Sequence, residues 1–126
     1  MYTIDVSHEF CAAHALSISG AKEPLHGHNF KIHAVISTDE LDRDGLVCDF
    51  HTALDILKDI CDPYANNNLN EIAPFDKSNP TAELIARFIH DELADRLNAA
   101  IAPARVDSVS VSEAPGCIAT YTNDAR

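Results

Sequence analysis

Strict alternation of apolar and polar residues near the start constrains this chain more than any other feature. From Tyr2 to His14 every second residue falls on one face, and the alternation resumes in phase from His26 to Ile36. A period of two is typical of a strand that is buried on one face. Because only residues 15–25 join the two segments, we expect an antiparallel pair of strands.

Two segments in the middle of the chain follow a helical period. Apolar residues recur every three or four positions in residues 50–61, and Asp49 is expected to cap that helix. A second helix is expected to have Asn79 as its cap and Pro80 at its first position, and to end before Pro103.

The last part of the chain alternates again. Residues 106–113 and 117–122 are expected to be strands joined by a turn at Pro115-Gly116. The element order is then β-β-α-α-β-β, and 126 residues fit a single domain, residues 1–126. Two helices have to pack on one face of a four-stranded antiparallel sheet, so the predicted fold is a two-layer α+β domain.

The other face of that sheet and its two edges need cover. We expect this face still to carry Val35, Val47 and Cys11. Sheets with such a face and with unpaired edges are commonly completed by neighbouring subunits. The sequence therefore predicts an oligomer.

Charge and composition exclude several classes of function. Nine Lys and Arg against 20 Asp and Glu give a net charge of −11, which argues against binding to nucleic acid. No apolar run approaches the ~18 residues that span a bilayer, and the amino terminus lacks the pattern of a signal peptide, so no membrane partner and a cytoplasmic location are expected. The four cysteines are scattered and are expected to be buried thiols.

Three of the seven histidines indicate a metal site. His26 and His28 share one face of a strand with Cα atoms ~6.5–7 Å apart, which lets two imidazoles reach one ion. His14 ends the preceding strand on the same inward face. Three neutral imidazoles leave a fourth tetrahedral position open, as in a catalytic zinc site. The alternative is a set of core histidines with hydrogen-bonded partners.

The remaining histidines are expected elsewhere. His33 faces the opposite side of its strand, and His51 and His90 are expected on the surfaces of helices. His8 shares the inward face, where it is either a core residue or a member of the site.

At these residues the sequence resembles the 6-pyruvoyl-tetrahydropterin synthase family, which includes 6-carboxy-tetrahydropterin synthase of queuosine biosynthesis. The resemblance runs through nearly the whole chain in order. The matching segments are Phe10-Cys11-Ala12-Ala13-His14, Leu25-His26-Gly27-His28, Gly45-Leu46-Val47-Cys48-Asp49-Phe50, Leu69-Asn70, Asn79-Pro80-Thr81-Ala82-Glu83 and Glu113.

The resemblance implies the tunnelling fold (T-fold) and specific roles. Trimers would close twelve strands into a barrel and stack in pairs as a homo-hexamer, with pockets for a pterin-like small molecule between subunits. His14, His26 and His28 match the zinc ligands, which hold the hydroxyls of the substrate side chain. Glu113 matches the carboxylate that binds the guanidine-like edge of the pterin, and Thr81 matches a contact to the pterin ring. Without the family, Glu113 would be read as a surface carboxylate and Thr81 as a hydroxyl at a helix start.

The sequence departs from the family at the residues of proton transfer. The family's catalytic cysteine, four residues before the H-G-H pair, is Lys22 here, and residues 65–67 hold no Asp-His pair to activate a thiol. Glu23 gives the pattern E-x-x-H-G-H, which resembles a branch in which glutamate is the base. The alternative for Glu23 is a solvated loop carboxylate.

These departures leave two functional expectations. The first is a pterin-binding homologue that does not perform the standard synthase reaction. The second is a zinc-dependent lyase that cleaves the side chain of 7,8-dihydroneopterin triphosphate, or of a related pterin, with Glu23 as catalytic base.

Overall fold

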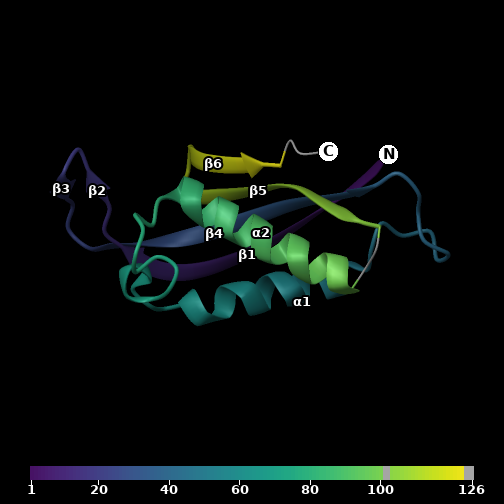
Figure 1. Cartoon of the computed structure of the whole chain (residues 1–126), viewed down its shortest axis with the longest axis horizontal. Coiled ribbons are helices and arrows are strands. Elements are labelled where there is room, and N and C mark those ends of the chain that lie inside the picture. Colours follow the sequence, from purple (N-terminus) through teal and green to yellow (C-terminus); the bar gives the residue numbers. More distant parts are fainter. Residues whose placement is uncertain (101–102, 124–126) are drawn as a thin grey trace.

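Four long strands form one antiparallel sheet in the order β1-β4-β5-β6 (Figure 1). The computed structural model describes residues 1–100 and 103–123. The strands of the sheet are β1 (Tyr2–His14), β4 (His26–Thr38), β5 (Arg105–Ala114) and β6 (Cys117–Thr122). The helices are α1 (Phe50–Cys61) and α2 (Ala82–Ala100), and the short elements are β2 (Ser17–Ile18), β3 (Ala21–Lys22) and the 3-10 turns η1 (Asp62–Tyr64) and η2 (Leu69–Glu71).

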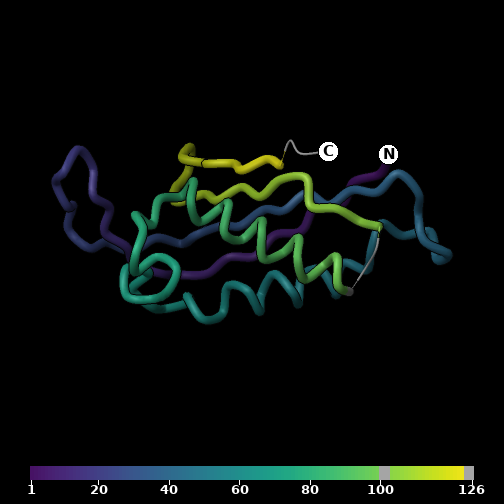
Figure 2. The backbone as a smooth tube through the Cα atoms, viewed as in Figure 1, coloured from purple at the N-terminus to yellow at the C-terminus, as the bar shows by residue number. Residues whose placement is uncertain are grey.

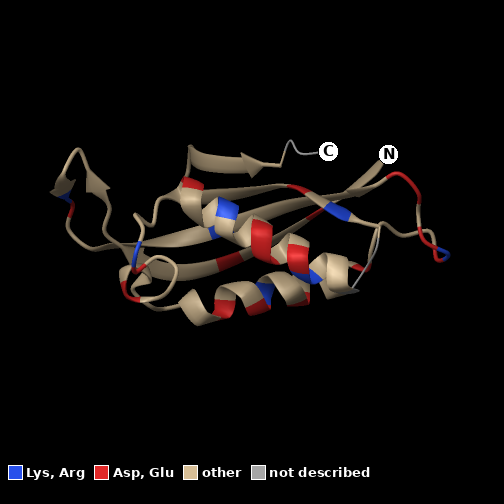
Figure 3. Cartoon of the chain, viewed as in Figure 1, with Lys and Arg blue, Asp and Glu red and all other residues tan. Residues whose placement is uncertain are grey.

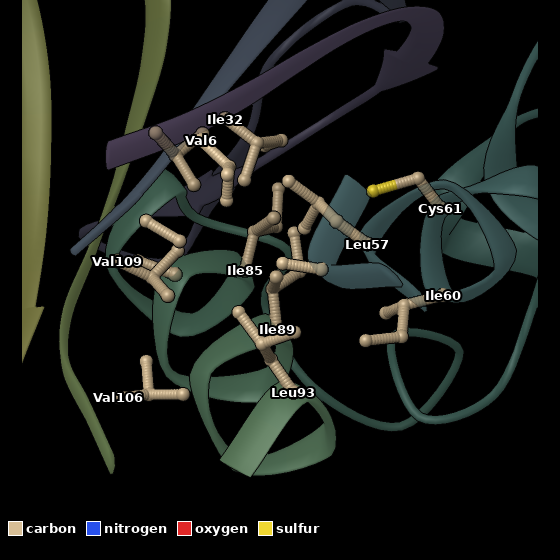
Figure 4. Close-up of a cluster of buried hydrophobic side chains, with 14 of the residues drawn as sticks. Val6, Ile32, Leu57, Ile60, Cys61, Ile85, Ile89, Leu93, Val106 and Val109 are labelled. Carbon is tan, nitrogen blue, oxygen red and sulfur yellow. The ribbon is translucent and has the colours of Figure 1, made fainter. Parts of the chain in front are cut away.

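Both helices lie on one face of the sheet, so the predicted two-layer α+β architecture is confirmed (Figures 1 and 2). The apolar face of each strand meets the apolar stripes of α1 and α2, and the buried side chains interdigitate in one cluster (Figure 4). Among the fully buried members are Phe30, Ile32, Leu57, Leu93 and Val109. Burial of each such side chain contributes about 1.5–3 kcal/mol, so this layer supplies the main stabilisation of the fold.

The alternation predicts the strand faces correctly. In β1 and β4, Val6, Phe10, Phe30 and Ile32 point into the core, and the residues between them are mostly exposed. The antiparallel register places Tyr2 opposite Thr38 and continues without interruption to the far end of β1. As a result, the histidines at the ends of the two strands are cross-strand neighbours.

The first helix begins as expected and the second does not. Asp49 caps α1 by accepting a hydrogen bond from the backbone N–H of His51 at 2.7 Å. In contrast, the prediction that Asn79 caps α2 is wrong, because α2 begins at Ala82 and the hydroxyl of Thr81 accepts the N–H of Leu84 at 3.1 Å. A tertiary contact occupies the Asn79 side chain and so removes it from capping.

The segment between β1 and β4 contains a small hairpin that the alternation did not predict. Strands β2 and β3 pair antiparallel and project beyond the end of the sheet (Figure 1). Two asparagine side chains anchor its base. Asn70 bonds both the N–H and the carbonyl of Ala15, each at 2.8 Å, and Asn79 bonds the same two groups of Ser17 at 2.8 and 2.9 Å.

The outer face of the sheet is mainly polar. Its side chains pair across strands, as in the Asp5–His33 contact at 3.3 Å and the Ser110–Thr120 hydrogen bond at 2.7 Å. Val35 is partly buried there, whereas the prediction for Val47 is wrong, because this residue precedes α1 and packs in the core.

The expectation of four buried thiols is half right. Cys48 and Cys61 are buried, but Cys11 and Cys117 are exposed. Cys11 lies on the outer face of β1, where its thiol donates to the Asn29 side-chain oxygen at 2.9 Å. Cys117 begins the edge strand β6, whose outer edge pairs with no other strand among the described residues.

Acidic side chains are spread along both helices and the loop after β4 (Figure 3). This distribution agrees with the net charge of −11. Neither helix, within the residues that the structure describes, has the length and apolar character needed to cross a membrane.

Candidate metal centre

The three histidines singled out from the sequence converge at one end of the sheet. His14 is the direct cross-strand partner of His26, and His28 lies two residues further along β4 on the same face. One ring nitrogen from each lies within 4.8 Å of the other two. The structure therefore brings together three imidazoles that can hold one metal ion.

Hydrogen bonds to the far sides of two rings set their tautomers. The Nδ1–H of His14 donates to the Pro80 carbonyl at 2.8 Å, and the Nδ1–H of His26 donates to the Pro24 carbonyl at 2.9 Å. A ring protonated at Nδ1 presents the lone pair of Nε2, which is the form that ligates a metal. Backbone carbonyls thus orient these two rings toward a common point.

Two Nε2 atoms in the group are buried without a protein partner. Those of His14 and His28 accept or donate no hydrogen bond within the described residues. A buried polar atom left unpaired costs about 1–3 kcal/mol, which an ion bound between the rings would remove. The residues present therefore fit a metal ion, and the alternative of hydrogen-bonded core histidines does not account for these two atoms.

Burial keeps His14 in its neutral form. The ring is fully buried, and this desolvation lowers the pKa of His14 below its usual value, against the opposing effects of the Pro80 carbonyl and the Glu113 charge. Phe30 packs edge-on against His14 and His28, with ring centroids 5.4 and 5.5 Å apart, and closes the site on the core side. A neutral imidazole is the form that a metal requires.

Two carboxylates flank the triad. Glu113, near the end of β5, has one oxygen 3.7 Å from Nε2 of His14 and the other 3.8 Å from Nε2 of His28. On the opposite side, Oε1 of Glu23 lies 3.6 Å from Nε2 of His26 and accepts the backbone N–H of Leu16 at 3.0 Å. The structure therefore places both sequence-predicted glutamates beside the histidines.

Glu113 stands between two open clefts. One, of about 1060 Å³, is lined by His28, Cys11, Lys31, Asn66 and their neighbours. The other, of about 680 Å³, lies between β6, the start of α2 and the residues before β2, and Thr81 and Glu83 line it. Thr81 and Glu113 thus share the second cleft, and the first cleft reaches the triad through His28.

The family model for 6-pyruvoyl tetrahydropterin synthase matches residues 3–124. The chain belongs to this family. A relative from Archaeoglobus fulgidus, named provisionally as a 6-carboxy-5,6,7,8-tetrahydropterin synthase, is 36% identical over 95 residues, which cover 74% of this chain and 76% of the relative.

Solved structures of family members share the fold. The 6-pyruvoyl tetrahydropterin synthase of Caenorhabditis elegans superposes with a TM-score of 0.82 at 22% identity, over 98% of this chain and 96% of the other. That of Plasmodium vivax gives 0.72 at 19% identity, over 98% and 99%. Two P. vivax structures are described as mutants of a catalytic residue, a glutamate replaced by alanine in one and by cysteine in the other.

The positions that match the family's catalytic cysteine and its Asp-His pair hold no thiol, carboxylate or imidazole in this chain. Lys22, where we placed the family's cysteine, is exposed in β3. Asn66 and Asn67 use their backbone to extend the edge of β1, through bonds to Cys11 and Ala13 at 2.6 and 3.0 Å.

The sequence reasoning missed three polar residues around the site. Asn70 and Asn79 anchor the backbone that follows His14, and Glu83 is a further carboxylate on the cleft of Thr81. The quoted segments contain all three, and Asn-Pro before a helix was read as a cap because that is its commonest use.

Of the other histidines, three lie where the sequence predicts and one does not. His33 faces the outer side of the sheet and His51 is exposed, as predicted, and His8 is partly buried on the inward face away from the triad. The prediction of an exposed His90 is wrong. This ring is buried, with Nε2 3.1 Å from the Val106 carbonyl and its face edge-on to Tyr121.

Proposed function

We propose that this chain binds a reduced pterin beside a zinc ion held by His14, His26 and His28, and cleaves the pterin side chain with Glu23 as base. The observation that carries the proposal is the position of Glu23. The N–H of Leu16 fixes one carboxylate oxygen, and that oxygen lies 3.6 Å from the imidazole of His26. A base at this place is within reach of a substrate group that approaches the metal centre.

The pterin ring would be recognised by Glu113 and Thr81. A carboxylate can accept two parallel hydrogen bonds from the guanidine-like edge of a pterin, which is a charge-assisted pairing. Thr81 lines the same cleft as Glu113, with its hydroxyl at the first turn of α2. This arrangement supports a ring held between β5 and α2 with its side chain directed at the histidines.

Each chain residue has a limited task in the reaction. A zinc ion in this site would act as a Lewis acid toward a side-chain hydroxyl or carbonyl of the substrate. Glu23 would accept the proton of the C2′ hydroxyl as the C1′–C2′ bond breaks, so that C2′ leaves as an aldehyde that carries the triphosphate. Glu23 would then return the proton to C1′, which stays on the pterin as the hydroxymethyl group. The Leu16 N–H holds the carboxylate in place, and the Pro80 and Pro24 carbonyls hold the rings of His14 and His26.

The pyruvoyl-forming reaction is not expected from this chain. It would need a thiolate with an activating partner, and the matching positions hold Lys22, Ala65 and Asn66. The P. vivax relative, in which a glutamate is named as a catalytic residue, supports a glutamate in that role. The expected product from 7,8-dihydroneopterin triphosphate is therefore 6-hydroxymethyl-dihydropterin.

Product analysis tests this proposal directly. Zinc-loaded protein is incubated with 7,8-dihydroneopterin triphosphate, and the pterins are separated and identified by mass. Wild type should yield 6-hydroxymethyl-dihydropterin, Glu23→Gln should lower the rate by about 100-fold or more, and exposed Glu71→Gln should leave it unchanged. Pyruvoyl-tetrahydropterin as the main product, or a Glu23→Gln variant as fast as wild type, would refute it.

A second candidate is a pterin-binding protein without turnover. The contacts of Glu23 favour this candidate, because its backbone N–H and its carboxylate both bond Leu16 and close the base of the hairpin. Glu23 therefore has a structural role that does not require catalysis. Calorimetry with neopterin and the product assay together separate the two candidates. Binding that Glu113→Ala weakens, with no product formed, would establish the second.

A further inference from the structure

We propose that the Glu113 carboxylate is an exchangeable fourth ligand of the metal centre, which occupies the open position until a pterin binds. The ligation itself rests on the geometry of the triad. The exchange rests on the proposed function, because it requires the same carboxylate to pair with the pterin ring.

The distances around Glu113 fit a shared ion better than a direct contact. Its two oxygens lie 3.7 and 3.8 Å from the unpaired Nε2 atoms of His14 and His28. A hydrogen bond would bring nitrogen and oxygen to about 2.7–3.2 Å. Two ligand atoms at about 2.1 Å from one ion, at angles near tetrahedral or slightly wider, lie roughly 3.4–3.7 Å apart. The carboxylate therefore lies at or just beyond this spacing from the rings of His14 and His28, and a small movement of its side chain would bring one oxygen to the ion held by the three histidines.

Position on the strand directs this side chain at the triad. In β5 the residues Val109 and Val111 face the helices, and Glu113 follows them where the pairing with β6 shifts between Ser112 and Ala114. Its distances to His14 and His28 show that its side chain lies on the side of the histidines. Its side chain is 22% exposed, so it has lost most of its contact with water. A positive ion between Glu113 and the rings would compensate for that desolvation.

Glu23 does not compete for the same role. Its Oε1 already accepts the Leu16 N–H at 3.0 Å, and it approaches a single ring, that of His26. Glu113, in contrast, spans two rings with two oxygens. The two glutamates thus have different roles: the Leu16 N–H fixes the carboxylate of Glu23, and the carboxylate of Glu113 is free to ligate the metal ion.

The exchange follows from the position of Glu113 on both clefts. A carboxylate that accepts the two donors of a pterin edge cannot keep its place on the metal ion. Binding of the ring would free the fourth position for the hydroxyls of the substrate side chain. While no pterin is present, Glu113 would occupy the fourth position and keep small solutes from binding the metal ion.

Metal binding without any pterin tests the ligation. Co²⁺ is titrated into metal-free wild type, Glu113→Gln, Glu113→Asp and the control Glu9→Gln, which removes one charge from the wall of the larger cleft. Affinity is measured by chelator competition, and coordination by the visible absorption of Co²⁺. Both Glu113 variants should bind at least about 10-fold more weakly with altered absorption, and Glu9→Gln should match wild type.

The shorter Asp side chain keeps the charge but shortens the reach, so it separates ligation from simple attraction. Circular dichroism confirms that each variant is folded. Affinity and absorption unchanged in Glu113→Gln would overturn the ligation, and so would an Asp variant that behaves as wild type.

Addition of neopterin to the Co²⁺ proteins tests the exchange. The absorption of wild type should shift on binding, and that of Glu113→Gln should not show this shift. Calorimetric binding without any shift in wild type would overturn the exchange alone. Absence of binding would overturn the exchange and the proposed function, while the ligation would still be decided by the metal titration.

Discussion

Thr81 has a structural role that is independent of any ligand. Its hydroxyl caps α2, so Thr81→Ala should lower the free energy of unfolding by about 1 kcal/mol, and Thr81→Ser should retain most of it. Urea denaturation measures both effects.

Calorimetry with neopterin then separates capping from ring binding at Thr81. If the hydroxyl also contacts the ring, the affinity falls in Thr81→Ala and is restored in Thr81→Ser. Equal affinity in all three proteins would assign Thr81 to capping alone.

The buried thiol of Cys61 predicts a loss of stability in alkali. Burial raises the pKa of Cys61 from 9.0 to about 12 in the folded protein. Between these values the thiol ionises only in the unfolded state, so stability present below pH 9 is lost as the pH rises, by up to about 1.4 kcal/mol per pH unit.

Denaturation midpoints measured from pH 8 to 11 check this linkage. Cys61→Ala should be less stable at pH 8 but should show a shallower decline with pH than wild type. The exposed Cys117→Ala should retain the wild-type slope. A Cys61→Ala slope equal to that of wild type would contradict the assignment.

At the residue scale, the sequence predicts those positions that a repeating pattern places. His14, His26 and His28 follow from alternation, because each is in phase with the core face of its strand. Burial of His90 depends on the Val106 carbonyl and the Tyr121 ring, which belong to distant strands. No local pattern on α2 carries that information, so the helix position alone gave the wrong answer.

At the scale of elements, the two asparagine anchors connect the metal centre to the hairpin. Asn70 makes two hydrogen bonds to the backbone of Ala15, the residue after His14. Each is worth about 1 kcal/mol, so Asn70→Ala should lower the free energy of unfolding by about 1–3 kcal/mol. Loss of the anchor should also weaken Co²⁺ binding, because the His14 ring would be less well oriented.

Asn98→Ala, on the exposed side of α2, is the matched control and should lower neither quantity, because Ala favours the helix more than Asn does. Urea denaturation and chelator competition measure them separately. An Asn70→Ala protein with wild-type stability would show that water replaces the anchor without cost.

Local pattern predicts the long elements well and the short ones poorly. Helix α1 has the expected bounds because the Asp49 side chain accepts the N–H of His51 and, in the part of the chain that the structure describes, makes no tertiary hydrogen bond instead. Helix α2 begins later than expected because Asn79 bonds Ser17, 62 residues earlier in the chain. Strands β2 and β3 have two residues each, too few for alternation to be recognised.

At the scale of the whole molecule, the single chain leaves surfaces that a neighbour would cover. Strands β1 and β6 are the two edges of the sheet, and Ile118 on β6 is 66% exposed. The Asn66–Asn68 loop bonds only the final part of β1. Edge strands this long are normally paired or covered, which supports the expectation of a closed ring of subunits.

We therefore predict a homo-hexamer built as a dimer of trimers. Light scattering at micromolar concentration should give about 82 kDa, six times the 13.7 kDa chain. Ile118→Glu should yield smaller species, because a charge at the edge strand opposes pairing with the next subunit. Leu41→Glu, in the loop after β4, should keep the full mass. A wild-type mass of about 14 kDa would exclude the hexamer and, with it, a pterin pocket completed by a second subunit, so that Glu113 and Thr81 would have to bind the ring within one chain.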